Sequence, residues 1–317
     1  MTKATIFCFL LSFALSLLLC ALFIPLLKRL GTGQNILHYV KEHKNKGGTP
    51  TMGGLAFLLA ATVSSLVFCG FRDKPFLVSL AVGLGYMLVG FLDDYLKKRR
   101  GDNLGLRPYQ KIIFQLGVAV LASLYCCLNS LTTLVIPFTK FSVDIGWGML
   151  PLGMLVFLAT VNSVNLTDGL DGLAGSVSAV FFLVLGVLLC LQKQGGDTSM
   201  LCFALTGALL AYLVFNTNRA SVFMGDTGSL SLGGFVSCCA LFSGNALIIP
   251  IVGVMFVLSS ISVIIQVIYY KKTGKRVFLM APIHHHFQEK GYTEAKIVYA
   301  YTAVTAVLGV AVLLPFV

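Results

Sequence analysis

The sequence predicts an all-α, polytopic membrane protein that forms a single domain over residues 1–317. Of its residues, 57% are hydrophobic and only 11% are charged, whereas a soluble domain carries about 25% charged residues. Apolar segments of about 20 residues, the length that crosses a bilayer as a helix, recur along the chain. The nine cysteines are scattered without the spacing of metal ligands, so we expect them to pack as small apolar residues.

Ten apolar segments are expected to be transmembrane helices. They lie near residues 5–27, 53–70, 75–92, 110–128, 149–165, 172–191, 200–216, 229–243, 246–270 and 297–317. The first is longer than the apolar core of a signal peptide and is followed by Lys28 and Arg29, which favours a retained helix. The eighth is short, and its ends are the least well defined.

The positive charges predict how these helices are oriented. Ten spans place five loops on one side of the membrane: 28–52, 93–111, 166–171, 217–228 and 271–296. These loops hold 18 of the 23 Lys and Arg residues. Because basic loops stay in the cytoplasm, both termini are expected on the outer, periplasmic side. The net charge of +11 then reflects loops that face anionic lipid, and no nucleic-acid partner is predicted.

Two adjacent acids, Asp93 and Asp94, follow the third apolar segment in the stretch GFLDDYLK. Taken alone, such a pair is most often a solvated helix end. However, like charges beside hydrocarbon repel each other and are poorly solvated, and carboxylates at a helix C-terminus oppose the helix dipole. A cation is therefore expected beside them.

Further acids lie on the same cytoplasmic side. Asp168 and Asp171, in NLTDGLDGLAG, share one face if they are helical, and glycines there permit a tight or broken helix. Asp226 lies in a Gly-Asp-Thr-Gly turn just before the eighth segment. Clustered carboxylates suit Mg²⁺ together with substrate phosphates, and flanking Lys and Arg suit phosphoryl transfer. The alternatives are that Asp168 only caps a helix and that the turn only precedes one.

Three consecutive histidines, His284, His285 and His286, lie in the last cytoplasmic loop. Consecutive residues cannot all face one ligand, so the triplet favours contacts with an anion over a zinc site. A chance loop sequence is the alternative. There is no G-x-x-x-x-G-K-[ST] sequence, so a P-loop is excluded.

Together these segments resemble the polyprenyl-phosphate N-acetylhexosamine-1-phosphate transferase superfamily, which is glycosyltransferase family 4. The resemblance covers nearly the whole chain. It rests on the motifs KGGTPTMGG, GFLDDYLK, GLRPYQK, NLTDGLDGLAG, FNTN, FMGDTGSL and PIHHHF. The first and last of these indicate the branch whose donor is UDP-N-acetylmuramoyl-pentapeptide.

The resemblance implies an Mg²⁺-dependent reaction in the bacterial cytoplasmic (inner) membrane. Undecaprenyl phosphate attacks the β-phosphate of UDP-N-acetylmuramoyl-pentapeptide, which gives undecaprenyl-diphospho-N-acetylmuramoyl-pentapeptide and UMP. One substrate lies in the lipid bilayer and the other in the cytoplasm, so a site at the inner boundary is expected. Whether the reaction takes one step or passes through an aspartyl intermediate is left open.

The resemblance also implies roles for individual residues. Asp226 is expected to bind Mg²⁺, while Asp93, Asp94 and His284 complete the catalytic group, with Asp93 as the better candidate for orienting or deprotonating the attacking phosphate. Substrate contacts are expected from ten further residues, namely Lys46, Thr51, Lys97, Lys111, Asn165, Asp168, Asp171, Asn216, Phe223 and His285.

Two other functions are open at this stage. One is transfer from UDP-N-acetylglucosamine within the same superfamily, against which the segments at 49–54 and 282–287 argue. The other is a secondary transporter, which would carry ionisable groups near the bilayer midplane; no expected span has one near its centre. The sequence does not fix the oligomeric state, and a homodimer is one alternative.

Overall fold

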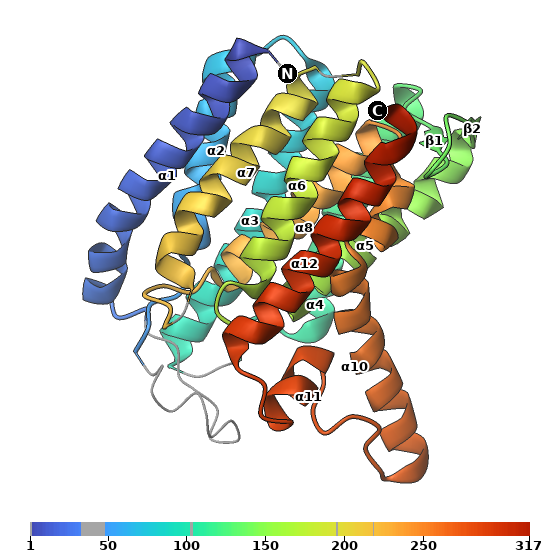
Figure 1. The fold of residues 1–317 in the computed structure, drawn as a ribbon. Coiled ribbons are helices and arrows are strands. Elements are labelled where there is room, and N and C mark those ends of the chain that lie inside the picture. The colour runs from blue at the N-terminus through green and yellow to red at the C-terminus, as the bar shows by residue number, and fades with distance from the viewer. Residues whose placement is uncertain (1, 33–47, 102–103, 195, 218) are drawn as a thin grey trace.

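Long helices account for most of the regular structure in the computed structural model, which describes residues 2–32, 48–101, 104–194, 196–217 and 219–317 (Figure 1). The α-helices are α1 (Lys3–Arg29), α2 (Gly54–Cys69), α3 (Lys74–Arg100), α4 (Pro108–Leu128), α5 (Met149–Thr167), α6 (Leu173–Leu191), α7 (Asp197–Asn216), α8 (Gly225–Phe242), α9 (Ile249–Val252), α10 (Val254–Thr273), α11 (Ile283–Glu289) and α12 (Glu294–Leu313). The short elements are β1 (Thr133–Val135), β2 (Ser142–Asp144), and the 3₁₀ helices η2 (Gly146–Gly148), η3 (Ala246–Ile248) and η4 (Leu314–Phe316).

Eight helices among the described residues are long and apolar enough to cross a membrane: α1, α3, α4, α5, α6, α7, α10 and α12. Several of them expose large apolar side chains. On α1, for example, Phe7, Leu18 and Leu22 are 59%, 56% and 58% exposed. Apolar surface of this extent is unfavourable in water but matches a bilayer, so the structure supports a helical, polytopic membrane protein.

The expected spans at 53–70 and 229–243 are helical but do not belong to those eight. Helix α2 has only 16 residues. Helix α8 begins with polar residues, and every residue from Thr227 to Phe242 is buried. Its surroundings are other helices rather than lipid. The count of ten spans therefore stays a prediction.

The expected span at 246–270 is divided into three pieces, η3, α9 and α10. Pro250 lies in the first turn of α9, and α9 ends at Gly253. A Cβ at Gly253 would lie 2.6 Å from the carbonyl oxygen of Ile249, so glycine allows the chain to bend there. Beyond this bend α10 diverges from the bundle (Figure 1).

Two predicted boundaries were wrong, and both concern the acids. Helix α3 does not end before Asp93 but continues to Arg100, so its last turn carries four basic residues that favour the helix dipole. Helix α8 starts at Gly225, which puts Asp226 in its first turn rather than in a preceding loop. There a carboxylate also interacts favourably with the dipole. Asp93 and Asp94 therefore do not lie at the C-terminal end of a helix, and the expected opposition to its dipole was wrong.

Helix α8 lies at the centre of the bundle and packs most extensively against α3 and α5. Glycine allows the closest approach. A Cβ at Gly90 of α3 would overlap the carbonyl oxygen of Asp226, and one at Gly54 of α2 would overlap Gly228. The backbones of α2, α3 and α8 therefore meet where the acids lie.

Both chain ends and the hairpin of β1 and β2 lie at one end of the bundle, whereas α11 lies at the opposite end (Figure 1). The hairpin is antiparallel, with Leu134 opposite Val143. Neither the hairpin nor the helix formed by the histidine segment was predicted.

Candidate active site

Asp226 accepts hydrogen bonds from three side chains that come from different helices. Its Oδ2 atom lies 2.8 Å from Nζ of Lys111 on α4 and 3.0 Å from Nζ of Lys97 on α3. Its Oδ1 atom accepts from Nδ2 of Asn165 on α5, at 2.8 Å, and Asn165 also donates to Ser229 Oγ. Helices α3, α4, α5 and α8 therefore converge on one carboxylate.

Asp94 binds the N-terminus of α8. Its Oδ2 atom accepts from the Thr227 backbone N–H at 2.9 Å and from Thr227 Oγ1 at 2.6 Å, while Oδ1 accepts from the Asp226 backbone N–H at 3.2 Å. First-turn N–H groups have no partner within their own helix. A buried carboxylate of α3 thus caps α8 from outside, across 132 residues of sequence.

Asp93 points toward a different set of partners. Its Oδ1 atom accepts from the Leu106 backbone N–H at 2.7 Å, and Oδ2 lies 2.6 Å from Nζ of Lys97, one helical turn along α3. Adjacent residues of a helix point about 100° apart, which explains why the two acids reach different neighbours. We expected the acid three positions before Lys97, which is Asp94, to turn toward the metal or toward this lysine. Lys97 instead contacts Asp93, four positions before it, so a pairing of Asp94 with Lys97 was wrong.

The three acids form a group whose chemistry fits a divalent cation. Asp93, Asp94 and Asp226 each offer a carboxylate oxygen, and these oxygens lie within 4.8 Å of one another. Asp93 and Asp94 are buried, 2% and 3% exposed, so their charge needs compensation. It is the only such group of His, Cys, Asp and Glu among the described residues. The histidines of α11 are not part of it.

Asp168 lies in the five-residue break between α5 and α6, as the glycines of that segment suggested. Burial raises the pKa of the half-buried Asp168 carboxyl well above its usual range, and the carboxylates of Asp226 and Asp94 raise it further. The turn therefore brings a fourth acid near the group. Asp171, in the same break, accepts from the Ala220 backbone N–H at 2.9 Å and holds the loop before α8.

The three histidines of α11 point three ways, as expected. His284 is fully buried, and neither of its ring nitrogens has a hydrogen-bond partner among the described residues. Burial lowers the pKa of His284 to about 3, with His285 contributing, so the ring is neutral at physiological pH. His285 pairs with Gln288, and His286 accepts from the Leu279 backbone N–H. The rings of His284 and His285 pack against Gly169, which joins α11 to the Asp168 turn.

Three other predicted residues lie near the start of α8. A Cβ at Gly225, which has φ of +69°, would overlap Asp94 and lie 2.6 Å from Thr51 Oγ1, so Thr51 belongs to the cluster. The Phe223 backbone pairs with Pro50 and Gly53, and its side chain is half-buried. Asn216 is buried, with its amide accepting from Gly172 N–H and donating to Val222; its contact with a nucleotide stays a prediction.

One predicted residue, Lys46, lies outside the described residues. Two site residues were missed, Thr227 and Ser229. Thr227 belongs to the Gly-Asp-Thr-Gly motif, so its position was visible in the sequence, but its hydrogen bond to Asp94 was not. Ser229 carried no signal of its own.

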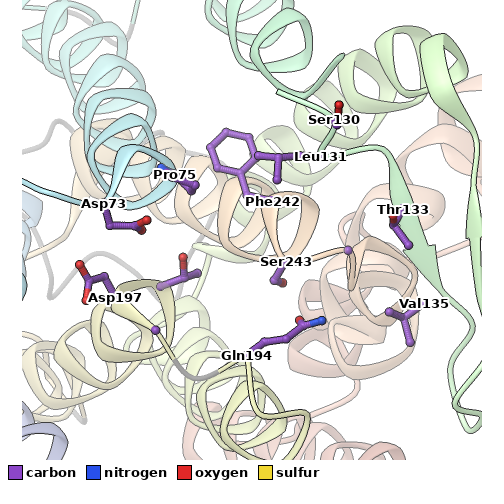
Figure 2. A pocket seen from close by; sticks show the side chains of 13 residues that line it. Asp73, Pro75, Ser130, Leu131, Thr133, Val135, Gln194, Asp197, Phe242 and Ser243 are labelled. Atoms are coloured by element: carbon purple, nitrogen blue, oxygen red, sulfur yellow. The ribbon is translucent and has the colours of Figure 1, made fainter. Parts of the chain in front are cut away.

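A pocket at the other end of the bundle is separate from this site (Figure 2). Asp73 and Asp197 lie on one side of it and Thr133 and Val135 on the other. Helix α3 begins beside this pocket and ends beside the acid group. None of the predicted site residues lines it.

Known proteins are similar to this sequence along nearly its whole length. Residues 76–244 match the model of glycosyl transferase family 4. The phospho-N-acetylmuramoyl-pentapeptide-transferase of Shouchella clausii is 44% identical over 315 residues, which is 96% of this chain and 95% of that protein. The protein of the same name from Caldanaerobacter subterraneus subsp. tengcongensis is 42% identical over 311 residues, 97% of each chain. The chain belongs to the phospho-N-acetylmuramoyl-pentapeptide-transferase family.

Membership of the phospho-N-acetylmuramoyl-pentapeptide-transferase family confirms the resemblance drawn from the motifs. A third member, from Clostridium botulinum, is 44% identical over 306 residues, 94% of this chain and 92% of that protein. The family 4 match contains Asp93, Asp94 and Asp226, so it covers the acid group described above. The rival assignment to a secondary transporter is thereby removed.

Proposed function

We propose that this chain transfers phospho-N-acetylmuramoyl-pentapeptide from its UDP-linked precursor to undecaprenyl phosphate, giving lipid I and UMP for peptidoglycan synthesis. The observation that carries the proposal is the convergence of Asp93, Asp94 and Asp226 with Lys97 and Lys111. Phosphoryl transfer depends mainly on positioning and on neutralising charge, and this cluster combines acids for a metal with cations for phosphates.

The position of the cluster suits one lipid and one soluble substrate. Helix α3 carries Asp93 and Asp94 past its apolar part and ends in the exposed residues Lys98, Arg99 and Arg100. The acids thus lie where α3 changes from apolar to basic residues. The phosphate of a carrier lipid, at the headgroup level of the bilayer, would lie at the same depth. The carrier lipid would reach the acids from the bilayer, and the nucleotide would reach them from the cytoplasm.

Mg²⁺ is the cofactor that the donor set favours. Asp226 is the expected ligand, with Asp93 and Asp94 beside it, because Mg²⁺ prefers carboxylate oxygens and takes further ligands from phosphates. When bound, the ion would neutralise charge on the diphosphate. The chain's own residues do the rest: Asp93 orients the attacking phosphate, and Lys97 and Lys111 bind phosphate oxygens.

The nucleotide is assigned to the turns beside the acid group. We expect Phe223 to stack on uracil, with Asn165, Asp168, Asp171 and Asn216 around the nucleoside. Thr51 and Lys46 are assigned to the phosphates or uracil, and His284 and His285 to the phosphate or sugar region. The neutral ring of His284 fits a hydrogen-bonding role rather than that of a permanent cation.

We also propose ten membrane spans with both termini outside, in the bacterial inner membrane. The charge distribution and the common position of both chain ends support this arrangement (Figure 1). A homodimer stays a prediction without further support.

The direct test is turnover by the purified protein in detergent micelles with undecaprenyl phosphate, Mg²⁺ and either UDP-N-acetylmuramoyl-pentapeptide or UDP-N-acetylglucosamine. We expect UMP release and a lipid-linked product with the first donor only. Asp226→Asn should keep the elution profile of the native protein but lose turnover, because an amide is a weaker Mg²⁺ ligand than a carboxylate. Turnover with the second donor instead would support the rival transferase.

A further inference from the structure

The acid group is bridged by ammonium groups from the chain itself. Nζ of Lys97 lies 2.6 Å from Asp93 Oδ2 and 3.0 Å from Asp226 Oδ2. Nζ of Lys111 lies 2.8 Å from that same Asp226 oxygen. One lysine therefore joins two of the three acids, and two lysines share one carboxylate oxygen.

These contacts differ from ordinary surface ion pairs. The side chains of Lys97 and Lys111 are 30% and 19% exposed, and those of Asp93 and Asp226 are 3% and 14% exposed. Partial burial strengthens charge interactions relative to water. A carboxylate oxygen has about two lone-pair sites, and two N–H donors occupy both of them on Asp226 Oδ2. A metal ion can bind this oxygen only if an ammonium group moves.

We propose that the Lys97 ammonium group and the divalent cation compete for the same carboxylate oxygens, so that Lys97 lowers the affinity of the acid group for the cation. This inference rests on the proposed function, in which Asp226 binds the metal. Lys97 is the lysine that spans Asp93 and Asp226, and its flexible stem of four carbons allows the ammonium to move by side-chain rotation. Once displaced, its positive charge becomes available to a diphosphate held beside the acids.

Cation affinity and turnover, measured separately, distinguish competition by Lys97 from a structural or substrate-binding role. If Lys97 only supported the fold of the site or only bound substrate, its removal would leave cation affinity unchanged or weaken it. If it competes with the cation, removal strengthens cation binding while turnover falls. Opposite changes in affinity and activity are therefore the distinguishing result.

The experiment titrates Mn²⁺ into the purified full-length protein, without nucleotide, and measures free Mn²⁺ by electron paramagnetic resonance. Lys97→Met should bind Mn²⁺ at least about tenfold more tightly than the native protein, because the substitution removes a positive charge that contacts two of the carboxylates that would hold the ion. Lys97→Arg keeps the charge and should stay close to the native affinity. Lys98→Met is the matched control, because Lys98 is the exposed neighbour on the same helix.

Unchanged or weaker Mn²⁺ binding in Lys97→Met, with native elution and native thermal stability, would overturn the proposal. If that variant does not fold, Lys97→Gln removes the charge but keeps a polar end and must show the same tightening. Asp226→Asn should lose Mn²⁺ binding; retention would remove the metal site and this inference with it. Failure of the native protein to release UMP would contradict the proposed function even if Mn²⁺ bound more tightly to Lys97→Met.

Discussion

Asp93 and Asp94 are neighbours with different tasks. Asp94 accepts three hydrogen bonds from the first turn of α8, whereas Asp93 accepts one backbone hydrogen bond, from Leu106, and pairs with Lys97. Asp94 therefore joins two helices, and Asp93 faces the lysine that the substrate phosphates would also attract. Asp94 thus has mainly a structural role, and Asp93 has the chemical one.

Asp94→Asn should destabilise the protein more than Asp93→Asn does. An amide presents one oxygen and one NH₂, so at least one N–H group of α8 would lose its acceptor. Hydrogen bonds to charged groups contribute about 1.5–3 kcal/mol each, whereas Lys97 keeps Asp226 as a partner when Asp93 is changed. Thermal unfolding of both variants in the same detergent measures the difference. Equal losses would mean that the cap on α8 contributes nothing.

Asp168 should make the folded protein less stable as the pH rises. Its pKa is raised by burial and by nearby acids, so from the usual pKa of an Asp, about 4, up to its raised value the folded state binds more protons than the unfolded state. Stability falls with pH wherever that holds. Asp168→Asn removes the effect, so it should raise the melting temperature more at pH 8 than at pH 5. A pH-independent shift would show that the carboxyl does not titrate there.

The identity of these residues could be predicted, but most of their partners could not. The motifs named Asp93, Asp94, Asp226, Asn165 and Lys111. The sequence contains no local signal that Asp94 caps a helix beginning 131 positions later or that Asn216 is occupied by Gly172 and Val222. Such contacts depend on which helices pack together. The spacing of apolar residues predicts the helices but not their neighbours.

At the scale of elements, a pair of amides connects the helices that hold Asp226. Gln115 on α4 and Asn162 on α5 exchange hydrogen bonds of 2.8 and 3.4 Å. Gln115 is fully buried and lies one turn beyond Lys111, and Asn162 lies one turn before Asn165. The pair thus fixes the two helices next to the residues that contact Asp226.

Gln115→Leu should lower turnover by more than its loss of stability explains. The matched control is Gln192→Leu, because Gln192 and Asn245 form the same reciprocal pair, with two distances of 3.0 Å, near the other end of the bundle. Turnover per folded molecule and melting temperature are compared for both variants. The double variant Gln115→Asn/Asn162→Gln, which exchanges the two amides, should have higher turnover than Gln115→Leu. If both single variants lost turnover equally, the pair beside the site would have no special role.

The type of each long element followed from the sequence, but several ends did not. Residues 93–100 were expected to begin a cytoplasmic loop, yet they extend α3 by about two turns. Lys97 to Arg100, in the last of these turns, are good helix formers. Pro250 and Gly253 are helix-breaking residues and indicate the break between α9 and α10. They lie within a long apolar run, which favoured one continuous helix. The β1–β2 hairpin has β-branched residues on both strands, but its strands have only three residues each, too few for a clear pattern in the sequence.

At the scale of the whole molecule, the distribution of charge predicts which end faces the cytoplasm. The β1–β2 hairpin and the loop after α10 lie at opposite ends of the bundle (Figure 1). A protease site inserted at the exposed Lys140 should be cut from outside intact spheroplasts, and one inserted at the exposed Gly274 only after permeabilisation. Exposed turns tolerate such insertions. The reverse pattern would invert the proposed topology and place the acid group outside.

The helical cap that Asp94 provides also has a consequence for biosynthesis. Asp94 and the Asp226 N–H that donates to it are 132 residues apart. A ribosome adds about 5–20 residues per second, so this part of α8 follows Asp94 by about 7–26 s. During that interval Lys97 can already pair with Asp93 within the same helix, but the groups that Asp94 binds have not yet been made. Until α8 is made, Asp94 therefore lacks the partners that it has in the folded protein. Helix α8, whose first turn is polar, then joins helices that already contain its cap. The synthesis of α8 thus completes the central packing of the bundle and, through Asp226, the acid group at the same time.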